Sequence, residues 1–521
     1  MKHFAALLEQ LVFTPGRNAK LRHLERYFAT IPDPDRGWAL AALAQGLELP
    51  NVTSSRIRGL VEDCVDPVLF RLSYDYVGDL AETVALIWPQ DGRDPPTLGE
   101  VIGSLRSAGP ASAAATIAGL CDRMGASERL ALIKLATGGL RVGVSARLAR
   151  TALAGWSGRD LARIEELWFA LSPPYRELFD WLEGGPEPEV DLETAFRPMM
   201  LANPVNDRLE GLIPSEYSAE WKWDGIRVQA VSFQGTRRLY TRTGDEIGTA
   251  FPDVIESMDW AGAVDGELLI VREGSIAPFA DLQKRLGRKR VGAKTMADAP
   301  AHLRLYDILH DGIEDTRSLP LDDRRDRLDR WFASIRPVRT DLSDMISFTS
   351  WDDLSRLRDG AREAGQEGLM LKRRDAPYTG GRPMGPWFKW KRDPLSADCV
   401  IIYAQRGHGK RSSYYSDYTF AAWRPGPEGP ELVPVGKAYS GFTDEELRML
   451  DRFVRNNTIE RYGPVRAVKP ELVVEVAFDA VQLSGRHKSG IAMRFPRIKR
   501  IRWDKPAEDA DTLAGLMALV G

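Results

Sequence analysis

The sequence predicts a multidomain protein with an all-α N-terminal domain, an α+β middle domain and a C-terminal β-barrel domain. Three observations lead to this fold class. The chain has 521 residues, which is too long for a single hydrophobic core. Apolar residues recur at helical spacing in the first third, whereas strand-like runs alternate with helical stretches in the middle. Short strand-like runs separated by turn residues make up the last part. We therefore expect domains over residues 1–185, 195–392 and 395–521.

The composition is that of an ordinary globular protein, with 43% hydrophobic and 28% charged residues. No run of about 18 apolar residues occurs, so we expect no membrane span. Glu9 and Gln10 interrupt the first apolar stretch, which argues against a signal peptide. The cysteines Cys64, Cys121 and Cys399 lie far apart and form no Cys-x-x-Cys pair, which disfavours a zinc ribbon or a disulfide framework. These features predict a reducing, cytoplasmic location.

Residues 1–185 are predicted to be mostly helical, because apolar side chains recur at helical spacing in segments such as 130–135. The segment 137–144 stands apart. Its glycines permit close backbone approach, and Arg141 within it could reach a phosphate. A plain glycine-rich link between two helices is an equally good interpretation of the same residues. The Gly- and Pro-rich segment 183–189 is predicted to be an interdomain linker.

The middle domain is predicted to mix strands and helices. Strand-like runs lie at 228–233, 238–242, 263–271, 303–309 and 368–372, and helical stretches lie at 321–332 and 351–364. Carboxylates occur at the ends of several strands, as in Asp265-Gly266-Glu267 and in Glu367-Gly368. Lys389 and Lys391 are predicted to share one face of a strand, with aromatic residues on the other. Each feature also has an ordinary interpretation, as a turn or as a solvated strand face.

The middle domain is predicted to be organised around residues 220–227, Glu-Trp-Lys-Trp-Asp-Gly-Ile-Arg. The alternation of apolar and polar residues predicts a strand that ends in a turn at Asp224-Gly225. Large rings on both sides can desolvate Lys222, which disfavours the ammonium form, and a neutral amine is a nucleophile. Gly225 lacks a Cβ and would let a phosphate or a second backbone come close. The alternative interpretation is a surface lysine on an ordinary strand.

The C-terminal part is predicted to be a small barrel of the oligonucleotide-binding (OB) type. Residues 486–505 hold eight basic residues and one acid, in a chain whose net charge is −3, which predicts a phosphate-facing surface. A second basic cluster lies in the middle domain and comprises Lys284, Arg285, Arg288, Lys289 and Arg290. Either cluster could instead be a solvated face.

Seven short motifs follow one another along the middle and C-terminal parts. They are Lys222-Trp223-Asp224-Gly225, Thr241-Arg242-Thr243-Gly244, Asp265-Gly266-Glu267, Tyr306-Asp307, Glu367-Gly368, Lys389-Trp390-Lys391 and Arg494-Phe495-Pro496-Arg497. In order and rough spacing they resemble the motifs of the ATP-dependent DNA ligases, within the covalent nucleotidyltransferases. The resemblance is strong over residues 195–510. Residues 1–185 look like the DNA-binding domain of larger ligases, with 140–143 as the best-matching stretch, and the combination is similar to bacterial ligases of this type.

The resemblance implies an adenylation (nucleotidyltransferase) domain in the middle of the chain and a role for each motif. Lys222 would receive AMP through a phosphoramidate bond, Tyr306 would stack on adenine, and Glu220 would lie beside the adenine edge. Further nucleotide contacts are implied for Arg227, Arg242, Glu267, Lys389, Lys391, Arg494 and Arg497, the last two orienting the pyrophosphate.

The resemblance also implies a metal, a substrate and a reaction. Glu267 and Glu367 would hold Mg²⁺ or Mn²⁺. The residues expected to contact DNA are Arg141, Lys284, Arg285, Arg288 and Lys289. ATP would adenylate the lysine, AMP would pass to the 5′-phosphate of a nick in duplex DNA, and the 3′-hydroxyl would displace AMP. The family suggests a monomer that acts near the nucleoid in DNA repair, replication or recombination, and the sequence names no protein partner.

Four alternatives are less favoured. NAD-dependent ligases use the same lysine motif, but they usually carry a four-cysteine zinc site, which three scattered cysteines cannot form. RNA ligases and capping guanylyltransferases share the core, and the helical domain together with the Arg-Phe-Pro-Arg segment favours a DNA ligase over both. A nick-binding protein without catalysis is disfavoured because every expected catalytic residue type is present.

Overall fold

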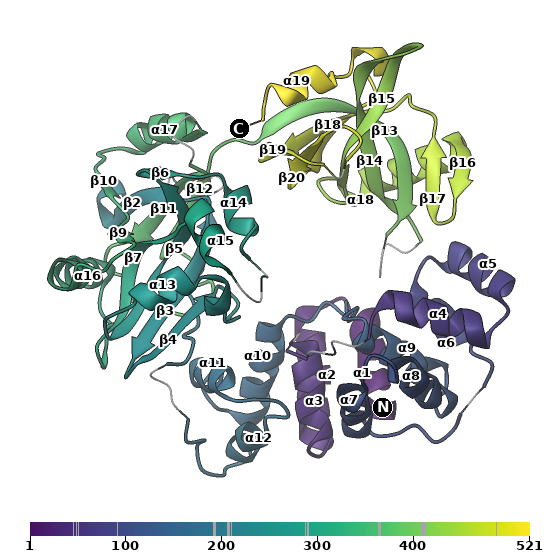
Figure 1. Ribbon diagram of the computed structural model, residues 1–521, viewed down its shortest axis with the longest axis horizontal. Coiled ribbons are helices and arrows are strands. Elements are labelled where there is room, and N and C mark those ends of the chain that lie inside the picture. Colours follow the sequence, from purple (N-terminus) through teal and green to yellow (C-terminus); the bar gives the residue numbers. More distant parts are fainter. Residues whose placement is uncertain are drawn as a thin grey trace. The chain divides into compact units, whose positions relative to one another are not determined.

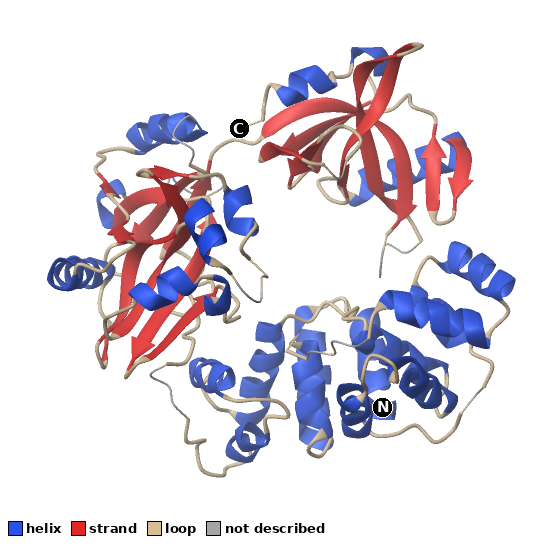
Figure 2. Cartoon of the chain, viewed as in Figure 1, coloured by secondary structure: helices blue, strands red, loops and turns tan. Residues whose placement is uncertain are grey.

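The computed structural model describes the whole chain except residues 45, 48, 50–51, 91, 191–193, 206–208, 210, 287, 289–290, 363–365, 408–412, 486 and 521. Its contacts divide the chain into two compact units. One unit is Leu153–Asp393, and the other combines Met1–Ala152 with Pro394–Gly521. Figure 1 labels the helices and strands, and Figure 2 colours them by type. Among the described residues, no helix has both the length and the apolar character needed to cross a membrane.

The described N-terminal part is helical, as predicted (Figure 2). Local sequence explains where several helices begin. Asp66 caps one helix by accepting hydrogen bonds from two backbone N–H groups, and Thr97 and Glu100 form a capping box at another. The helices are α1 (Lys2–Phe13), α2 (Arg17–Thr30), α3 (Asp35–Leu43), α4 (Ser54–Cys64), α5 (Pro67–Val77), α6 (Leu80–Ile87), α7 (Leu98–Ser107), α8 (Ala113–Asp122), α9 (Ala126–Ala136) and α10 (Ala146–Ser157).

The unit Leu153–Asp393 starts with the end of α10 and with two further helices, α11 (Leu161–Ala170) and α12 (Arg176–Leu182). These helices pack onto the α+β part of the same unit. The rings of Phe169 on α11 and Phe196 lie 4.5 Å apart edge to face, and Glu166 on α11 forms a 2.7 Å ion pair with Arg317. Residues 153–185 therefore belong, by contact, with the α+β residues that follow them.

Two sheets form the rest of this unit. The first has the strand order β1-β12-β11-β2-β10, and the second has the order β4-β3-β5-β7-β8, with β6 beside β5 and β9 beside β7. The first sheet contains β1 (Asn203–Pro204), β2 (Tyr217–Lys222), β10 (Met345–Ile346), β11 (Gly368–Arg373) and β12 (Trp387–Lys391). The second contains β3 (Ile226–Phe233), β4 (Thr236–Thr241), β5 (Gly262–Arg272), β6 (Ser275–Ile276), β7 (Ala301–Asp311), β8 (Glu314–Asp315) and β9 (Thr340–Leu342). The helices are α13 (Pro252–Ser257), α14 (Phe279–Gln283), α15 (Ala293–Asp298), α16 (Leu321–Ile335) and α17 (Trp351–Asp359).

Strand alternation determines which side chains the two sheets direct toward each other. On β2, Ala219 packs in an outer core with Leu369, whereas Glu220 and Lys222 have the opposite parity and lie on the other face. On β5, Val264 packs in the outer core of the second sheet. Because side chains alternate along a strand, Asp265 and Glu267 lie on the inner face, toward the first sheet. A small inner core between the sheets includes Met200, Val231, Ala263, Leu309, Tyr378 and Trp387. The polar residues of the motifs are therefore gathered on the facing sides of the two sheets.

The prediction that Lys389 and Lys391 share one face of a strand, with aromatic residues on the other, needs one correction. Lys389 and Lys391 do share a face of β12, and Phe388 and Trp390 pack in the outer core on the other. Trp387, however, lies in the inner core, on the same side as the lysines. An aromatic residue two positions before a lysine has the same parity as that lysine, so it cannot lie on the opposite face.

The C-terminal part forms a curled sheet around a large main core, with a smaller cluster that includes Val400 and Val473, in agreement with the predicted barrel. The strand order is β15-β14-β13-β17-β16, and β18 pairs with both β13 and β21. Buried side chains such as Phe420, Val474 and Phe478 fill the interior. The elements are β13 (Leu395–Arg406), β14 (Tyr415–Gly426), β15 (Gly429–Ala438), α18 (Asp444–Asn457), β16 (Thr458–Tyr462), β17 (Val465–Val468), β18 (Val473–Phe478), β19 (Ala480–Leu483), β20 (Ile491–Arg494), β21 (Arg497–Arg502) and α19 (Leu513–Met517).

Candidate active site

The site is built at the end of β2, where three strands of the first sheet converge. Gly368 at the start of β11 pairs with Lys222 on one side and with Lys391 on the other. A Cβ on Gly368 would lie 2.3 Å from the Trp390 carbonyl oxygen, and its φ is +139°, so only glycine fits there. The Glu-Gly motif thus brings Glu367 between two lysines that are distant in sequence.

Glu367 joins the two lysines. The Nζ of Lys222 donates a hydrogen bond to the Glu367 carboxylate, and the Nζ of Lys391 lies 3.7 Å from the same oxygen. The backbone N–H of Glu367 also donates to the Lys222 carbonyl at 2.9 Å. The Lys222 side chain keeps 23% of its surface exposed, so its amine is accessible. The arrangement holds a primary amine at the end of a strand with a carboxylate against it.

The turn after Lys222 packs against the second sheet. A Cβ on Gly225 would lie 2.6 Å from the Leu268 carbonyl oxygen and 2.7 Å from Glu267 Cγ. Of the two roles expected for Gly225, the structure therefore shows the close approach of a second backbone. The packing places the turn that carries Lys222 directly against Glu267.

Glu267 is the second carboxylate beside Lys222. Burial, with help from the charges of Glu367 and Asp265, raises the pKa of Glu267 to about 8, although Lys222 and Arg227 act in the opposite direction. Among the described residues, none donates a hydrogen bond to this carboxylate. A carboxyl group that is costly to ionise without a partner is typical of a place where a cation is to bind.

Five cations gather at the same end of the unit. Burial lowers the pKa of Lys389, and the positive charges of Arg382, Lys391, Lys222 and Arg242 lower it further. An excess of positive charge is costly in a protein unless an anion completes it. Arg382 was missed by the sequence interpretation; its only sequence signal is its place seven residues before Lys389 in a Gly- and Pro-rich loop.

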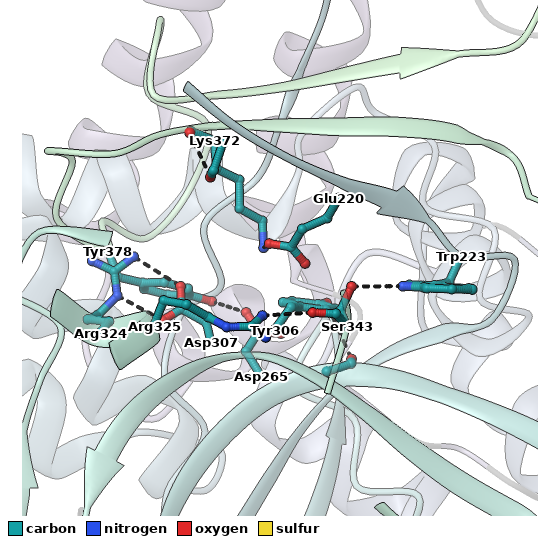
Figure 3. Close-up of polar contacts among 12 residues, drawn as sticks. Glu220, Trp223, Asp265, Tyr306, Asp307, Arg324, Arg325, Ser343, Lys372 and Tyr378 are labelled. Atoms are coloured by element: carbon teal, nitrogen blue, oxygen red, sulfur yellow. Dashed lines mark hydrogen bonds and ion pairs between the residues drawn. The ribbon is translucent and has the colours of Figure 1, made fainter. Parts of the chain in front are cut away.

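Glu220 and Tyr306 are linked by Lys372, which contacts both side chains. Lys372 forms a 2.8 Å ion pair with Glu220, and its Nζ lies 4.3 Å from the centre of the Tyr306 ring (Figure 3). Both members of the pair are almost completely buried, at 2% and 3% side-chain exposure. Lys372 is a site residue that the sequence interpretation did not identify, although it follows the Glu-Gly motif by four positions on the same strand.

Arg227 is held by protein groups in the structure. Its guanidinium bonds both oxygens of Asp265, at 3.0 and 2.5 Å, and also the Met200 carbonyl and the Tyr378 hydroxyl. It lies 5.8 Å from the centre of the Tyr306 ring. The nucleotide contact that the resemblance implies for Arg227 stays a prediction.

Two family models match this chain. The model of the ATP dependent DNA ligase domain matches residues 199–391, and that of the ATP dependent DNA ligase C terminal region matches residues 411–505. A probable DNA ligase of Koribacter versatilis is 36% identical over 432 residues, which cover 78% of this chain and 74% of that protein. The chain belongs to the ATP-dependent DNA ligase family. It is therefore an ATP-dependent DNA ligase, a member of a family of enzymes that act on nicked DNA.

Two further similarities cover nearly the whole of this chain. A probable DNA ligase of Opitutus terrae is 32% identical, over 98% of this chain and 61% of that protein. The solved structure named Pmar-Lig_Pre covers 96% of this chain and 99% of its own at a TM-score of 0.64 and 17% sequence identity, which shows a shared fold. The predicted fold class is thereby confirmed: a helical N-terminal region, an adenylation domain and a C-terminal OB-fold domain.

The residues predicted to contact DNA differ in their surroundings. Arg141 is exposed in the loop between α9 and α10, and Lys284 and Arg288 are exposed after α14. Lys289 lies outside the described residues. Arg285 requires a correction, because it is fully buried: its guanidinium bonds Asp253 and the carbonyls of Ala250 and Ala299, so it cannot reach DNA in this structure.

Arg494 and Arg497 of the ligase lie in the C-terminal domain, at the end of β20 and the start of β21. The Arg494 guanidinium lies 5.3 Å from the centre of the Phe495 ring, and Arg497 forms a 3.4 Å ion pair with Asp479. Phe495 has a φ of +52° and 62% exposure, so the turn between the two arginines is displayed on the surface of its domain. Their role toward pyrophosphate stays a prediction.

The carboxylates Glu267 and Glu367 fit a magnesium site that water and phosphates complete better than a site enclosed by protein ligands alone. Within the described part of the chain, no group of three or more His, Cys, Asp or Glu residues could by itself enclose a metal ion. Magnesium characteristically uses one or two carboxylates and completes its shell with water and substrate phosphates. Glu267, with its raised pKa, and Glu367 match that pattern beside Lys222.

Proposed function

We propose that the ligase seals nicks in duplex DNA through a covalent lysyl-AMP intermediate on Lys222. The observation that carries the proposal is the arrangement around this amine. Glu367 is bonded to it, Glu267 lies beside the turn that follows it, and Lys222 belongs with Lys391, Arg242 and Arg382 to the cations whose charges act on Lys389. A triphosphate would supply the negative charge that this cluster lacks.

The first step would use Lys222 as the nucleophile. Its Nζ would form a bond to the α-phosphorus of ATP while the bond from that phosphorus to the pyrophosphate oxygen breaks. Lys389, Lys391 and Arg242 would stabilise the negative charge of the transferring phosphoryl group, and electrostatic stabilisation of this kind is often the largest contribution to such a reaction.

The carboxylates would govern the protonation of Lys222. In the structure Glu367 accepts a hydrogen bond from Nζ. A divalent cation, Mg²⁺ or Mn²⁺, held by Glu267 and Glu367 would supply positive charge to the phosphates. Glu367 would then no longer serve as the ion-pair partner of Lys222, and the neutral, nucleophilic amine would be favoured.

Adenine would be held beside Tyr306 and Glu220. The aromatic ring offers a stacking surface, and the Glu220 oxygen that is not bonded to Lys372 could accept a hydrogen bond from the exocyclic amine. In the second step AMP would move from Lys222 to the 5′-phosphate of the nick. In the third the 3′-hydroxyl would attack that phosphate and release AMP.

The test is incubation with α-labelled ATP, in parallel with labelled NAD, with divalent metal, followed by a denaturing gel. We expect a labelled protein band from ATP only, and no band for Lys222→Ala. Lys294→Ala is the matched control, because this lysine is exposed on α15 and should label normally. Normal labelling of Lys222→Ala would overturn the proposal.

The helical region is proposed to bind the nick, and the structure suggests where to cut the chain to test this. A protein that starts at Gly158 keeps α11, and with it the contacts of Phe169 with Phe196 and of Glu166 with Arg317. We expect it to lose nick affinity while self-adenylation continues. A protein that starts at residue 186 exposes the surface that α11 covers, so we expect it to adenylate poorly. Equal adenylation by the two proteins would contradict this.

The remaining proposals rest on the family. A monomer that works in the cytoplasm, near the nucleoid, in DNA repair, replication or recombination is the setting expected for such an enzyme. Contacts to DNA phosphates would make binding tolerant of sequence and sensitive to salt. Arg494 and Arg497 would orient the departing pyrophosphate.

A further inference from the structure

We infer that Trp223, the residue after the proposed nucleophile, is a positioning residue that sets the direction of the Lys222 side chain through Ser343 and Arg304. The inference rests on the proposed role of Lys222. It concerns a side chain that contributes no charge to the site and that contacts elements far away in sequence.

The first contact is a hydrogen bond. The Nε1 of Trp223 donates to Ser343 Oγ at 3.1 Å, and both residues are buried, with 8% and 0% exposure (Figure 3). Ser343 is itself fixed on two sides. Its N–H donates to the Leu305 carbonyl at 2.7 Å, and its carbonyl accepts a hydrogen bond from Arg325 at 2.8 Å. The acceptor of the Trp223 bond is thus tied to both β7 and α16.

The second contact is with the face of the ring. The Arg304 guanidinium lies 4.2 Å from the centre of the Trp223 ring, and two hydrogen bonds of 2.8 and 2.6 Å hold it to Asp341. Arg304 and Asp341 are also paired residues of the neighbouring strands β7 and β9. A guanidinium that is locked by a carboxylate is a rigid surface on which an aromatic ring can stack.

These contacts join the two sheets of the adenylation domain at the nucleophile. Lys222 ends β2 of the first sheet, whereas Ser343, Arg304 and Asp341 belong to the β7–β9 side of the second sheet. Trp223 is the next residue, so its indole fixes the backbone at the point where the chain crosses from one sheet to the other. The Lys222 carbonyl is fixed by the backbone N–H of Glu367, and the next residue, Trp223, is fixed by Ser343.

Control of this kind matters for an in-line attack. A shift of about 1 Å in the position of a reacting group can cost on the order of 100-fold in rate. The side chain of Lys222 is long and has many rotamers, so its backbone must be held for Nζ to meet the α-phosphate. Trp223 would therefore act on the rate of adenylation, with little effect on the affinity for ATP.

The experiment removes the same hydrogen bond from either end in the full-length protein. Trp223→Phe keeps a ring for Arg304 and removes the N–H donor, and Ser343→Ala removes only the acceptor. For each we expect the maximal rate of self-adenylation, in single turnovers, to fall on the order of 10-fold, with the half-saturating ATP concentration changed less than about 2-fold. The double variant should be no slower than the slower single variant, because both changes remove one bond.

A second readout separates positioning from general damage. Sealing of a pre-adenylated nick does not use the amine of Lys222, so we expect the variants to seal such a nick at the rate of the unmodified protein. Trp351→Phe is the matched control: its Nε1 donates to the Leu212 carbonyl at 3.0 Å, in the outer core, on the face of the first sheet opposite to the Lys222 side chain. It should adenylate normally.

Wild-type adenylation rates in both Trp223→Phe and Ser343→Ala would overturn the inference, as would an equal loss of adenylation and of sealing. If Trp223→Phe does not fold, Ser343→Ala alone decides. Normal labelling of Lys222→Ala would instead overturn the proposed function. The two failures are therefore distinguishable.

Discussion

Two groups of charges lie within the adenylation domain, one buried and one partly exposed, and they are built in opposite ways. In the first group every carboxylate is matched by one cation. Asp307 pairs with Arg324, both with 0% side-chain exposure, and Glu220 pairs with Lys372 (Figure 3). Asp265 is held in the same way by Arg227. These charges satisfy one another, and nothing further is needed to complete them.

In the second group the charges do not balance. The five cations Lys222, Lys389, Lys391, Arg242 and Arg382 lie near one another, and the two carboxylates Glu267 and Glu367 lie beside Lys222. The crowding of positive charge contributes, after burial, to the lowered pKa of Lys389, whereas burial together with Glu367 and Asp265 raises the pKa of Glu267 against the effect of Lys222. A matched group holds the fold together, whereas an unmatched group is completed by what it binds. Because the two groups lie in one domain, the difference can be tested with parallel substitutions.

Breaking a matched pair should have the largest effect. Arg324→Met leaves the buried Asp307 carboxylate unpaired, and it also removes hydrogen bonds to the carbonyls of Leu319 and Ala376. We expect the free energy of unfolding to fall by about 3–5 kcal/mol, measured by urea denaturation. The double change Arg324→Met with Asp307→Leu should recover much of this loss. A stability loss below about 1 kcal/mol in the single variant would contradict the matched description.

Removing a cation from the unmatched group should act on activity and leave stability intact. Lys389→Met removes a charge that is crowded by other positive charges, so the free energy of unfolding should stay within about 1 kcal/mol or rise. We expect self-adenylation to slow on the order of 100-fold, because a cation that faces the phosphates is lost. Destabilisation comparable with that of Arg324→Met would show that Lys389 stabilises the fold as the matched pairs do, and would contradict the distinction between the two groups.

The smallest effect concerns pH. The pKa of Glu267 is raised from 4.5 to about 8, so between these values the folded protein holds more protons than the unfolded chain. The contribution of this carboxyl to stability is therefore present below pH 4.5 and is lost as the pH rises toward 8. Without nucleotide or metal, the wild type should lose more stability between pH 5 and pH 8 than Glu267→Gln does, in melting experiments at several pH values. Parallel curves for the two proteins would contradict the raised pKa. Added Mg²⁺ should reduce the difference, because it favours the ionised form.

Local pattern allowed much of the site to be predicted. Alternation along residues 220–227 and 387–391 is enough to place Lys222 near the end of a strand and Lys389 and Lys391 on one face of another, since the parity of a strand is fixed by the residues that enter its core. The predicted middle strands also correspond to β3, β4, β5, β7 and β11. These features depend on neighbours in the sequence, which a reader of the sequence can see.

The parts that were missed depend on contacts between distant residues. Arg285 stands in a basic run, yet a carboxylate 32 residues away, Asp253, makes it a buried anchor. A run of charge gives no information about burial. Arg382 lies in a loop without periodicity, and the bond between Trp223 and Ser343 spans 120 residues. No local pattern encodes such pairings.

The ion pair between Lys222 and Glu367 has a consequence for the idle enzyme. An exposed, neutral lysine amine would be open to acylation by any reactive metabolite, and one such event would inactivate the molecule permanently. In the structure this amine is bonded to a carboxylate. With Lys222 as the proposed nucleophile, the enzyme at rest would keep this group capped by an internal counter-ion. The carboxylate proposed to take part in metal binding would thereby also protect the amine between reactions.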